Sequence, residues 1–365
     1  MTNMELAGGP LVGVKVVEFA GMGPGPFCAM LLADYGASVL QVVRPGATPS
    51  GPLIGRHRET VALDLKLPAD RAAALRLVED SDVLLEGYRP GVMERLRLGP
   101  AECHAVNDKL VYTRLTGWGQ AGELRDKAGH DINYIAMAGV LGSIGVSKPV
   151  VPLNVIGDYA GGALLAAFGV LAALRSAEKG ARHLVLDSSM RAGAAYLMSY
   201  HFEQLGAGAW QEKRGSNLLD GGAPFYDSYV CADGEWVAVG AIEDKFYGQL
   251  LAGLQLESLE TVDRFDAKNH DRIRNEFSAA FRRCTRAQWM ARFRHLDACV
   301  SPVLSLSEVA ADAAMVRERV PGMPEPRPNP VISGRMPDDP GHPKPRASQR
   351  SGADPIETPI RAERR

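Results

Sequence analysis

The stretch VKVVEFAGMGPGPFCAMLLADYGASVLQVV, residues 14–43, decides the fold class. It begins with an apolar, β-branched run typical of a buried strand, and the glycine-rich loop GMGPGP follows at 21–26. Residues 27–37 have the spacing of a helix ended by Gly36, and 38–43 resemble a second strand. A strand, a helix and another strand in this order predict an α/β domain with a largely parallel sheet.

The same alternation continues along the first half of the chain. We predict a helix at 71–80, strands at 82–86 and 109–119, a long helix at 159–180 and a strand at 183–190. Parallel sheets of this kind bind ligands beyond the carboxyl ends of their strands. We therefore expect the functional site at that edge of the sheet.

A second domain is predicted after this alternation ends. Residues 221–243 have the pattern of a β-hairpin with a turn at Asp233-Gly234, and helices are expected from there to about Phe293. The last 45 residues hold 11 of the 24 prolines, which favours an extended tail. The predicted parts are a large α/β domain at 1–200, a linker at 201–221, a small α+β domain at 222–312, and a return to the large domain at 313–365.

Composition limits the classes of function. The net charge of −2 and the lack of a basic stripe argue against a protein that binds nucleic acid. The five cysteines include no CxxC pair, which indicates reduced thiols and no zinc site. No secretory signal is recognisable, and the longest apolar stretch, 160–174, is short and interrupted by glycines. We therefore expect no membrane insertion and no metal, and a cytoplasmic location.

The glycine-rich loop and Arg44 suggest a phosphate site. The loop does not satisfy G-x-G-x-x-G, because Pro26 or Cys28 occupies the sixth position. Where a dinucleotide site has an acid, at the end of the second strand, this chain has Arg44, which suits a phosphate. The alternatives are a tight turn with a surface arginine, or an NADP-dependent reductase. Further basic residues near predicted strand ends favour a phosphorylated nucleotide carrier as ligand: Arg56, Arg58, Lys66, Arg89 and Arg95.

A histidine and an aspartate form the candidate catalytic pair. His130, in GHDINY (129–134), precedes an apolar helix expected to run through Leu141, and Asp158 lies directly before the predicted long helix. Taken alone, Asp158 would be an N-cap and His130 a packed residue. At two helix N-termini, however, a carboxylate is kept ionised and an imidazole is kept neutral. Together they could remove a proton and shelter the resulting enolate oxygen.

Other mechanisms lack their sequence signals. The chain contains no HExxH, GxSxG or GxxxxGK[ST] motif, and its other histidines are isolated. This leaves an acid/base enzyme that uses no cofactor and acts on a nucleotide-tagged substrate.

Eight stretches between about Leu11 and Glu308 resemble the α-methylacyl-CoA racemases of the family III CoA-transferase superfamily. They are VVEFAGMGPGP, EGYRPGVMERL, RLTGWGQ, GHDINY, PLNVIGDYAGG, NLLDGGAPFY, GAIEDKFY and DACVSPVL. The resemblance implies a Rossmann-like large domain, a smaller α+β domain and an interlocked homodimer. Each active site would combine the large domain of one subunit with the small domain of the other.

The resemblance also implies an activity and a set of site residues. The expected reaction is the R/S interconversion of 2-methylacyl-CoA thioesters at C2 through an enolate, in lipid metabolism, with CoA as part of the substrate. The catalytic histidine falls on His130, serving the S epimer, the aspartate on Asp158, serving the R epimer, and a third acid on Glu243. The implied contacts to CoA and substrate are Arg44, Arg56, Leu63, Asp64, Leu65, Lys66, Arg95, Gly129, Asp131, Ile132, Asn133 and Tyr134.

Two other functions are compatible with the same residues. In a CoA-transferase, Asp158 would be the nucleophile that accepts the acyl group, and in a non-catalytic acyl-CoA binding protein neither base would react. The chain also departs from the resemblance. The segment between His130 and Asp158 is slightly shorter, and 186–193 has two serines and Arg191 where the family has alanines and an acid.

Overall fold

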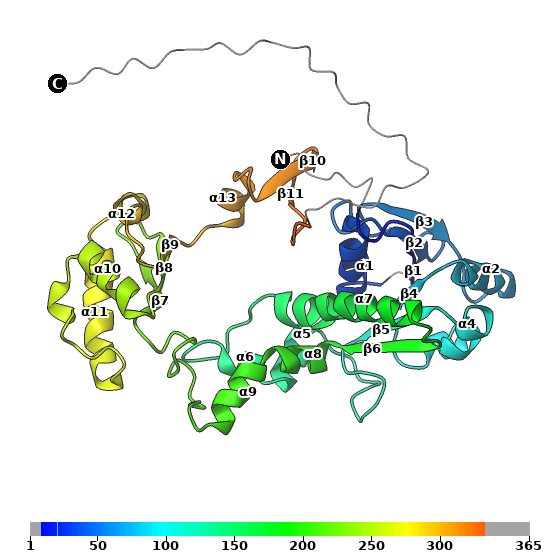
Figure 1. Cartoon of the computed structure of the whole chain (residues 1–365), viewed down its shortest axis with the longest axis horizontal. Helices are drawn as coiled ribbons and strands as arrows, with labels where there is room; N and C mark the ends of the chain where they lie inside the picture. The colour runs from blue at the N-terminus through cyan, green and yellow to red at the C-terminus, as the bar shows by residue number, and fades with distance from the viewer. Residues whose placement is uncertain (1–8, 20, 333–365) are drawn as a thin grey trace, which may run out of the picture. The chain divides into compact units, whose positions relative to one another are not determined.

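The computed structural model describes residues 9–19 and 21–332. Its main feature is a six-stranded sheet in the order β3-β2-β1-β4-β5-β6, with every neighbouring pair parallel (Figure 1). The strands are β1 (Lys15–Phe19), β2 (Ser38–Val43), β3 (Arg58–Ala62), β4 (Val83–Glu86), β5 (Val111–Thr116) and β6 (Leu184–Ser189). The predicted α/β class is confirmed.

The strand order creates a crevice beside β1. This strand pairs with β2 on one side and with β4 on the other, so the chain changes direction across the sheet at this point. In open α/β sheets, the carboxyl ends of the strands at such a switch point form the ligand-binding crevice. The fold therefore places a site after β1 and β4.

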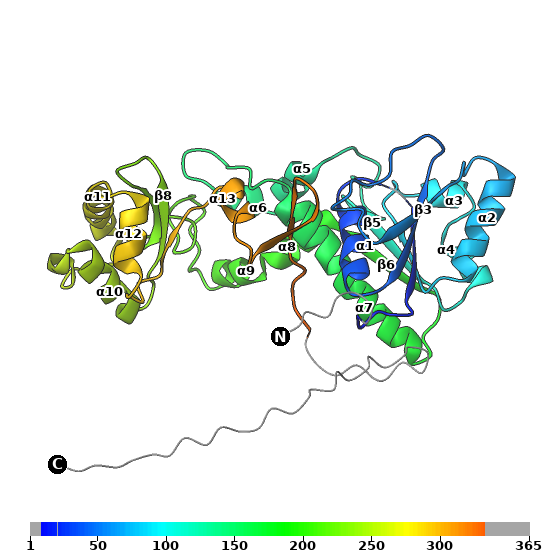
Figure 2. The ribbon, with the colours of Figure 1, turned by 90° about the horizontal axis from the view of Figure 1, so that it is seen from above.

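Helices cover both faces of this sheet (Figure 2). The helices of this part of the chain are α1 (Pro24–Asp34), α2 (Pro68–Glu79), α3 (Val92–Arg95), α4 (Pro100–Val106), α5 (Asp131–Met137), α6 (Val140–Ser143), η1 (Val155–Leu164), α7 (Leu165–Glu178), α8 (Met190–Leu197) and α9 (Ser199–Gly206), of which α1 and α7 cover one face and α2 and α4 the other. Successive residues of β1 point to opposite faces: Val16 joins a core with α1 and α7, while Val17 joins a core with α2 and α4. Both faces of the sheet are buried, which explains the nearly continuous apolar strands.

The helix that carries Asp158 differs from the prediction. It begins at Val155, not Tyr159, and its first part, η1, is a π-helix that continues directly into α7. Gly157, Gly161 and Gly162 weaken the helical signal of the sequence. They are buried, and at Gly193 of α8 an added Cβ would lie 1.9 Å from the Gly161 oxygen. Close packing against α8 thus favours the helix where local propensity does not.

Three further details differ from the prediction. The helix after GHDINY stops at Met137, because Gly139 adopts a φ of +86° and starts the separate helix α6. Strand β3 was not predicted, since this edge strand has a largely polar sequence, RETVA. The GMGPGP loop is shorter than expected because α1 begins at Pro24, a residue suited to the first turn of a helix.

Residues 223–300 form a core of their own, consistent with the α+β texture predicted for this segment. The predicted hairpin is present as β7 and β8, and β9 extends it to a three-stranded antiparallel sheet. The elements are β7 (Tyr226–Val230), β8 (Trp236–Gly240), α10 (Asp244–Leu254), η2 (Glu257–Leu259), η3 (Ala267–Asn269), α11 (His270–Phe281), α12 (Arg286–Phe293) and β9 (Val300–Pro302). The predicted domain boundaries themselves stay predictions.

The described part of the proline-rich tail, residues 321–332, contains a strand and no helix, which agrees with the prediction of an extended chain, but the pairing of this strand was not predicted. After α13 (Leu306–Ala310), strands β10 (Val316–Val320) and β11 (Met323–Pro326) form an antiparallel hairpin. Glu325, which is buried, pairs with both Arg317 and Arg319 across it. An edge strand tolerates prolines because its outer N–H groups need no partner. The tail prediction for 333–365 lies outside the described residues.

The helix formed by η1 and α7 also bears on the membrane prediction. Val155–Glu178 spans 24 residues and contains an 18-residue window with a mean hydropathy of 1.6, enough by length and composition to cross a bilayer. The argument that this apolar stretch is too short is therefore wrong. Core helices of globular proteins pass the same test, and η1 packs against α1, α5 and α8. The expectation of no membrane insertion now depends on this packing.

Candidate active site

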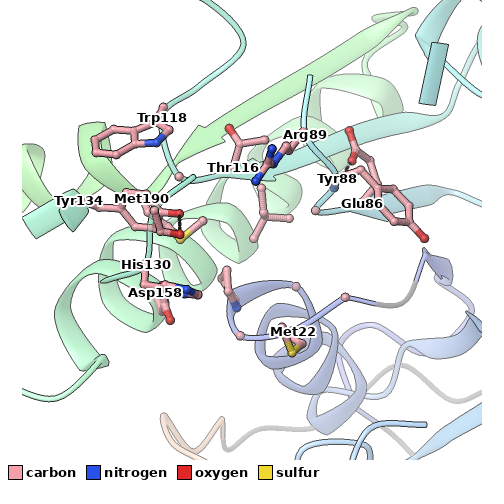
Figure 3. Close-up of a pocket in the computed structure, with 18 of the residues that line it drawn as sticks. Met22, Glu86, Tyr88, Arg89, Thr116, Trp118, His130, Tyr134, Asp158 and Met190 are labelled. Carbon is pink, nitrogen blue, oxygen red and sulfur yellow. Dashed lines mark hydrogen bonds between the residues drawn. The ribbon is translucent and has the colours of Figure 1, made fainter. Parts of the chain in front are cut away.

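A cavity of about 520 Å³ lies at the carboxyl ends of β1, β4 and β5, beside the strand switch point (Figure 3). The GMGPGP loop, the segment after β4, the glycine turn after β5, the beginning of α5 and the first turn of η1 line it. The predicted location of the site is thus occupied by a cavity. His130, Asp158, Gly129 and Tyr134 are the predicted site residues that line it.

His130 is the N-cap residue of α5 and is exposed to the cavity. Its main-chain N–H donates to Asn133 Oδ1 at 3.1 Å, which fixes the beginning of the helix. Tyr134, one turn later, donates its hydroxyl to the Gly129 oxygen at 2.5 Å and packs edge-on against Trp118. These contacts hold the segment before His130 and leave its imidazole side chain directed to the cavity.

Asp158 lies within the first turn of η1, so its predicted role as an N-cap is wrong. Its side chain is half-buried, and Asn154 Nδ2 donates to its Oδ2 at 3.2 Å. Burial raises the pKa of Asp158, the charge of Asp131 raises it further, and Asn154 and His130 lower it. Burial, the largest influence, therefore shifts the pKa of Asp158 in the direction opposite to that expected from the helix N-terminus.

His130 and Asp158 share this cavity although 28 positions separate them in the sequence. Figure 3 shows them at one end, away from Glu86 and Tyr88. An imidazole and a carboxylate beside one cavity can each take up or release a proton from a bound molecule.

Two buried acids in the cavity wall were not predicted as site residues. Glu18 is the penultimate residue of β1 and pairs with Arg58 at 2.6 Å; their side chains are 1% and 2% exposed. Glu86 ends β4, and burial raises its pKa to about 7, while the Tyr88 N–H bond and Arg114 lower it. The sequence signal that could have identified both residues is an acidic residue within the last two positions of an apolar strand, where ligands of parallel sheets bind.

The basic residues at the cavity differ in part from those expected. Arg89, Arg125 and Lys127 line it. Arg56, expected at CoA, instead donates to Asp34 and to the Leu53 oxygen, in an internal ion pair.

The remaining predicted CoA contacts lie at or near the same sheet edge. Arg44 follows β2 and is exposed, and Leu63 follows β3 and donates its N–H to the Val43 oxygen at 2.9 Å. The segment 63–66 therefore lies beside the end of β2. Arg95 ends α3 and is exposed. None of these six residues lines the cavity itself, so a contact to CoA stays a prediction for Arg44, Leu63, Asp64, Leu65, Lys66 and Arg95.

Three residues of GHDINY do not line the cavity, and neither does Glu243. Asp131 is buried, Ile132 is exposed, and Asn133 caps α5 through the His130 N–H. Glu243 is exposed and is the N-cap residue of α10. Because the resemblance assigns Glu243 to the site of a partner chain, its role stays a prediction. Among the residues described, no group of three or more His, Cys, Asp or Glu side chains is placed to hold a metal ion.

Comparisons with known proteins find a matching family and similar sequences. The sequence profile described as CoA-transferase family III matches residues 11–343. The chain is 46% identical over 301 residues to the human alpha-methylacyl-CoA racemase, covering 82% of this chain and 79% of that protein. It is 45% identical over 331 residues to the Mus musculus alpha-methylacyl-CoA racemase, covering 88% of this chain and 86% of that protein.

A solved structure has the same fold. A CAIB/BAIF family protein from Brucella suis superimposes with a TM-score of 0.75, over 89% of this chain and 93% of that one. Its sequence is 21% identical, so this likeness concerns the fold alone.

Proposed function

The chain belongs to CoA-transferase family III, and from this we propose that it is an isomerase that interconverts the R and S epimers of 2-methylacyl-CoA thioesters. The observation that carries the proposal is the meeting of His130 and Asp158 at one cavity beside the strand switch point. The relatives of this chain from human and Mus musculus are named alpha-methylacyl-CoA racemase.

The reaction needs two proton-transfer groups because the product has the opposite hand. The thioester carbonyl acidifies the adjacent C–H bond, one group removes that proton, and the electron pair moves onto the carbonyl oxygen as an enolate. The other group then donates a proton to the opposite face of C2, and the carbonyl re-forms. We assign removal from the S epimer to His130 and removal from the R epimer to Asp158. No electron leaves the substrate, so the proposal includes no cofactor.

The environment of Asp158 supports its use as both base and acid. Proton exchange is most efficient when the pKa of the group lies near the working pH. Burial moves the pKa of Asp158 upward, in that direction, and Asn154 supplies a hydrogen bond that orients the carboxylate. Free N–H groups at the beginning of a helix favour a developing negative charge nearby, which suits an enolate oxygen close to α5.

The CoA moiety is proposed to lie along the sheet edge formed by the ends of β2 and β3. Arg44 and the segment 63–66 occupy this edge, and Arg89 lines the cavity. Arginines suit the phosphates of a nucleotide because their guanidinium groups donate in pairs. We propose no such contact for Arg56, whose guanidinium group binds Asp34.

We further propose a homodimer in which Glu243 completes the site of the partner chain. An exposed apolar stripe along the η1–α7 helix supports an interface: Leu164, Phe168 and Leu171 are 54%, 69% and 46% exposed. These positions lie on one helix face. A cytoplasmic location and a place in lipid metabolism remain part of the proposal.

A labelling experiment tests the proposed activity. One epimer of a 2-methylacyl-CoA is incubated with the protein in D₂O, and deuterium at C2 and configuration are followed together. We expect deuterium uptake with conversion toward both epimers, and loss of the conversion in His130→Ala and Asp158→Ala, since each acid or base contributes about 10²–10⁴ in rate. Acyl transfer onto an added free acid, without label at C2, would instead indicate a CoA-transferase with Asp158 as nucleophile.

A further inference from the structure

Asp131 connects the two proposed bases through one hydrogen bond. It is the first residue of α5, directly after His130, and only 6% of its surface is exposed. Its Oδ1 accepts the main-chain N–H of Asp158 at 2.7 Å. Since the first N–H groups of a helix have no partner within it, this bond satisfies one that η1 leaves open. The helix that begins at His130 is thereby tied to the turn that carries Asp158.

The first turn of η1 packs closely against the Asp131 side chain. A Cβ atom added at Gly157 would lie 2.5 Å from Asp131 Oδ1 and 3.0 Å from Ile135 Cγ2. On the other side, a Cβ at Gly23 would lie 3.4 Å from Asp158 Oδ2. The main chain at Gly157, in the first turn of η1, therefore contacts the Asp131 carboxylate. The N-cap residue of α1, Gly23, lies beside the Asp158 side chain.

Asp131 is not needed to cap its own helix. Asn133 already binds the His130 N–H at the beginning of α5. A charged group near a helix N-terminus is normally solvated, whereas Asp131 is buried and its Oδ2 has no hydrogen-bond partner among the described residues. Burying an incompletely paired carboxylate is costly. Local structure alone does not account for it.

We propose that Asp131 is a positioning residue that fixes the separation of His130 and Asp158, a role that rests on the function proposed above. A two-base reaction requires both groups at set places on opposite faces of C2. Displacements of about 1 Å can reduce such rates about 10²-fold. The bond from Asp131 to the main chain of Asp158 restricts this displacement without touching the substrate cavity.

The charge of Asp131 also affects the pKa of Asp158, which gives a second measurement that tests the proposal. It is one of the influences that raise the pKa of Asp158, whereas His130 and Asn154 lower it. The other ionisable groups that line the cavity are Glu18, Glu86, Tyr88, Arg89, Arg125, Lys127, Tyr134 and Tyr159. An Asp131→Asn change retains an oxygen that can accept the Asp158 N–H but removes the charge. The geometric and electrical effects of Asp131 are thus separable.

Two variants and a matched control test this role in the full-length chain. Asp131→Ala removes the bond, and Asp131→Asn removes only the charge. Asp82→Ala is the control, because Asp82 also accepts a distant main-chain N–H, that of Lys15 at 2.8 Å, but does not line the cavity. Amide hydrogen exchange at Asp158 is measured without substrate, and C2 deuterium uptake from each 2-methylacyl-CoA epimer is measured against pH.

We expect Asp131→Ala to accelerate exchange at the Asp158 amide about tenfold, from the loss of one hydrogen bond, and to slow C2 uptake about 10²-fold. Asp131→Asn should keep the amide protected and shift the acidic limb of the profile, where Asp158 is the base, to lower pH. If Asp131→Ala matches Asp82→Ala in both measurements, the proposal is wrong. Faster amide exchange in Asp131→Ala with no C2 uptake even in the unaltered protein would support the bond and count against the proposed function alone.

Discussion

Asp158 lies where burial favours its neutral acid. Because its pKa is raised in the folded state, the folded chain binds the proton more tightly than the unfolded chain does. Ionisation therefore lowers stability as the pH rises from the usual aspartate pKa of about 3.9 through the raised value. We predict that Asp158→Asn unfolds at higher urea concentration than the unaltered protein at pH 7.5.

This difference should shrink as the pH falls below the ordinary range of aspartate, because both chains are then neutral at this position. Asp126→Asn, at an exposed position, is the control. A destabilised Asp158→Asn at neutral pH would show that the ionised carboxylate is favoured by the folded state, contrary to our interpretation.

Gly157 is the position where a single methyl group should disturb the site. Its missing side chain leaves room for Asp131 Oδ1 and for Ile135, both buried. We predict that Gly157→Ala lowers the unfolding free energy by about 1–3 kcal/mol and slows C2 proton exchange about 10²-fold. Gly142→Ala, where nothing lies within 4 Å of the added Cβ, should leave both unchanged. Equal behaviour of the two variants would contradict this account.

At the scale of single residues, the sequence predicts the reactive groups better than their surroundings. His130 and Asp158 were identifiable because a glycine precedes each of them and an apolar helical pattern follows. The partners of Asp158 were not predictable: Asn154 becomes its neighbour only because η1 begins four residues earlier than expected. Likewise, Asp131 was predicted as a substrate contact, whereas it lies buried against the main chain of η1.

At the scale of secondary-structure elements, the buried side chain of Arg58 connects β3, β1 and α1. Arg58 of β3 pairs with Glu18 of β1 and donates to the Pro26 oxygen of α1. Removing one member of a buried pair leaves the other charge unpaired, at a cost of about 3–5 kcal/mol. We predict a loss of this size in Arg58→Met, measured by urea unfolding.

The paired change Glu18→Gln with Arg58→Met should recover much of that stability, because no buried charge remains. If the single variant is as stable as the unaltered protein, the pair does not hold these elements together.

Strands with apolar runs were predictable from the sequence, and elements that depend on tertiary packing were not. Strand β2 occurs at 38–43, as predicted, because β-branched residues fill both buried faces. The edge strand β3 lacks such a run, and its place is fixed by pairing with β2. The π-helix η1 requires the close approach of α8 to its glycines, which involves residues distant in the sequence.

At the scale of the whole molecule, the exposed stripe on the η1–α7 helix predicts association. We expect Phe168→Asp to convert a dimer into monomers in sedimentation velocity, because a charge at the centre of an apolar interface is costly to bury. Leu306→Asp, at a residue of α13 that is 88% exposed and lies outside this stripe, should remain dimeric. A monomeric unaltered protein, or a dimeric Phe168→Asp, would contradict the proposed interface.

The sequence pattern of one chain does not show which residues a second chain contributes to a shared site. Glu243 is exposed at the beginning of α10 and does not line the cavity that contains His130. Its place at a site follows from the family resemblance, since no periodicity or spacing in the chain connects it to the cavity. The role of this residue therefore depends on the dimer.

The central claim is that two different groups exchange protons with opposite faces of C2, and deuterium uptake by single-base variants tests it most directly. Each epimer of a 2-methylacyl-CoA is incubated in D₂O with Asp158→Ala or with His130→Ala. We predict that Asp158→Ala incorporates deuterium into the S epimer alone and His130→Ala into the R epimer alone, both without inversion. Uptake into both epimers by either variant, or inversion by either, would contradict the two-base account.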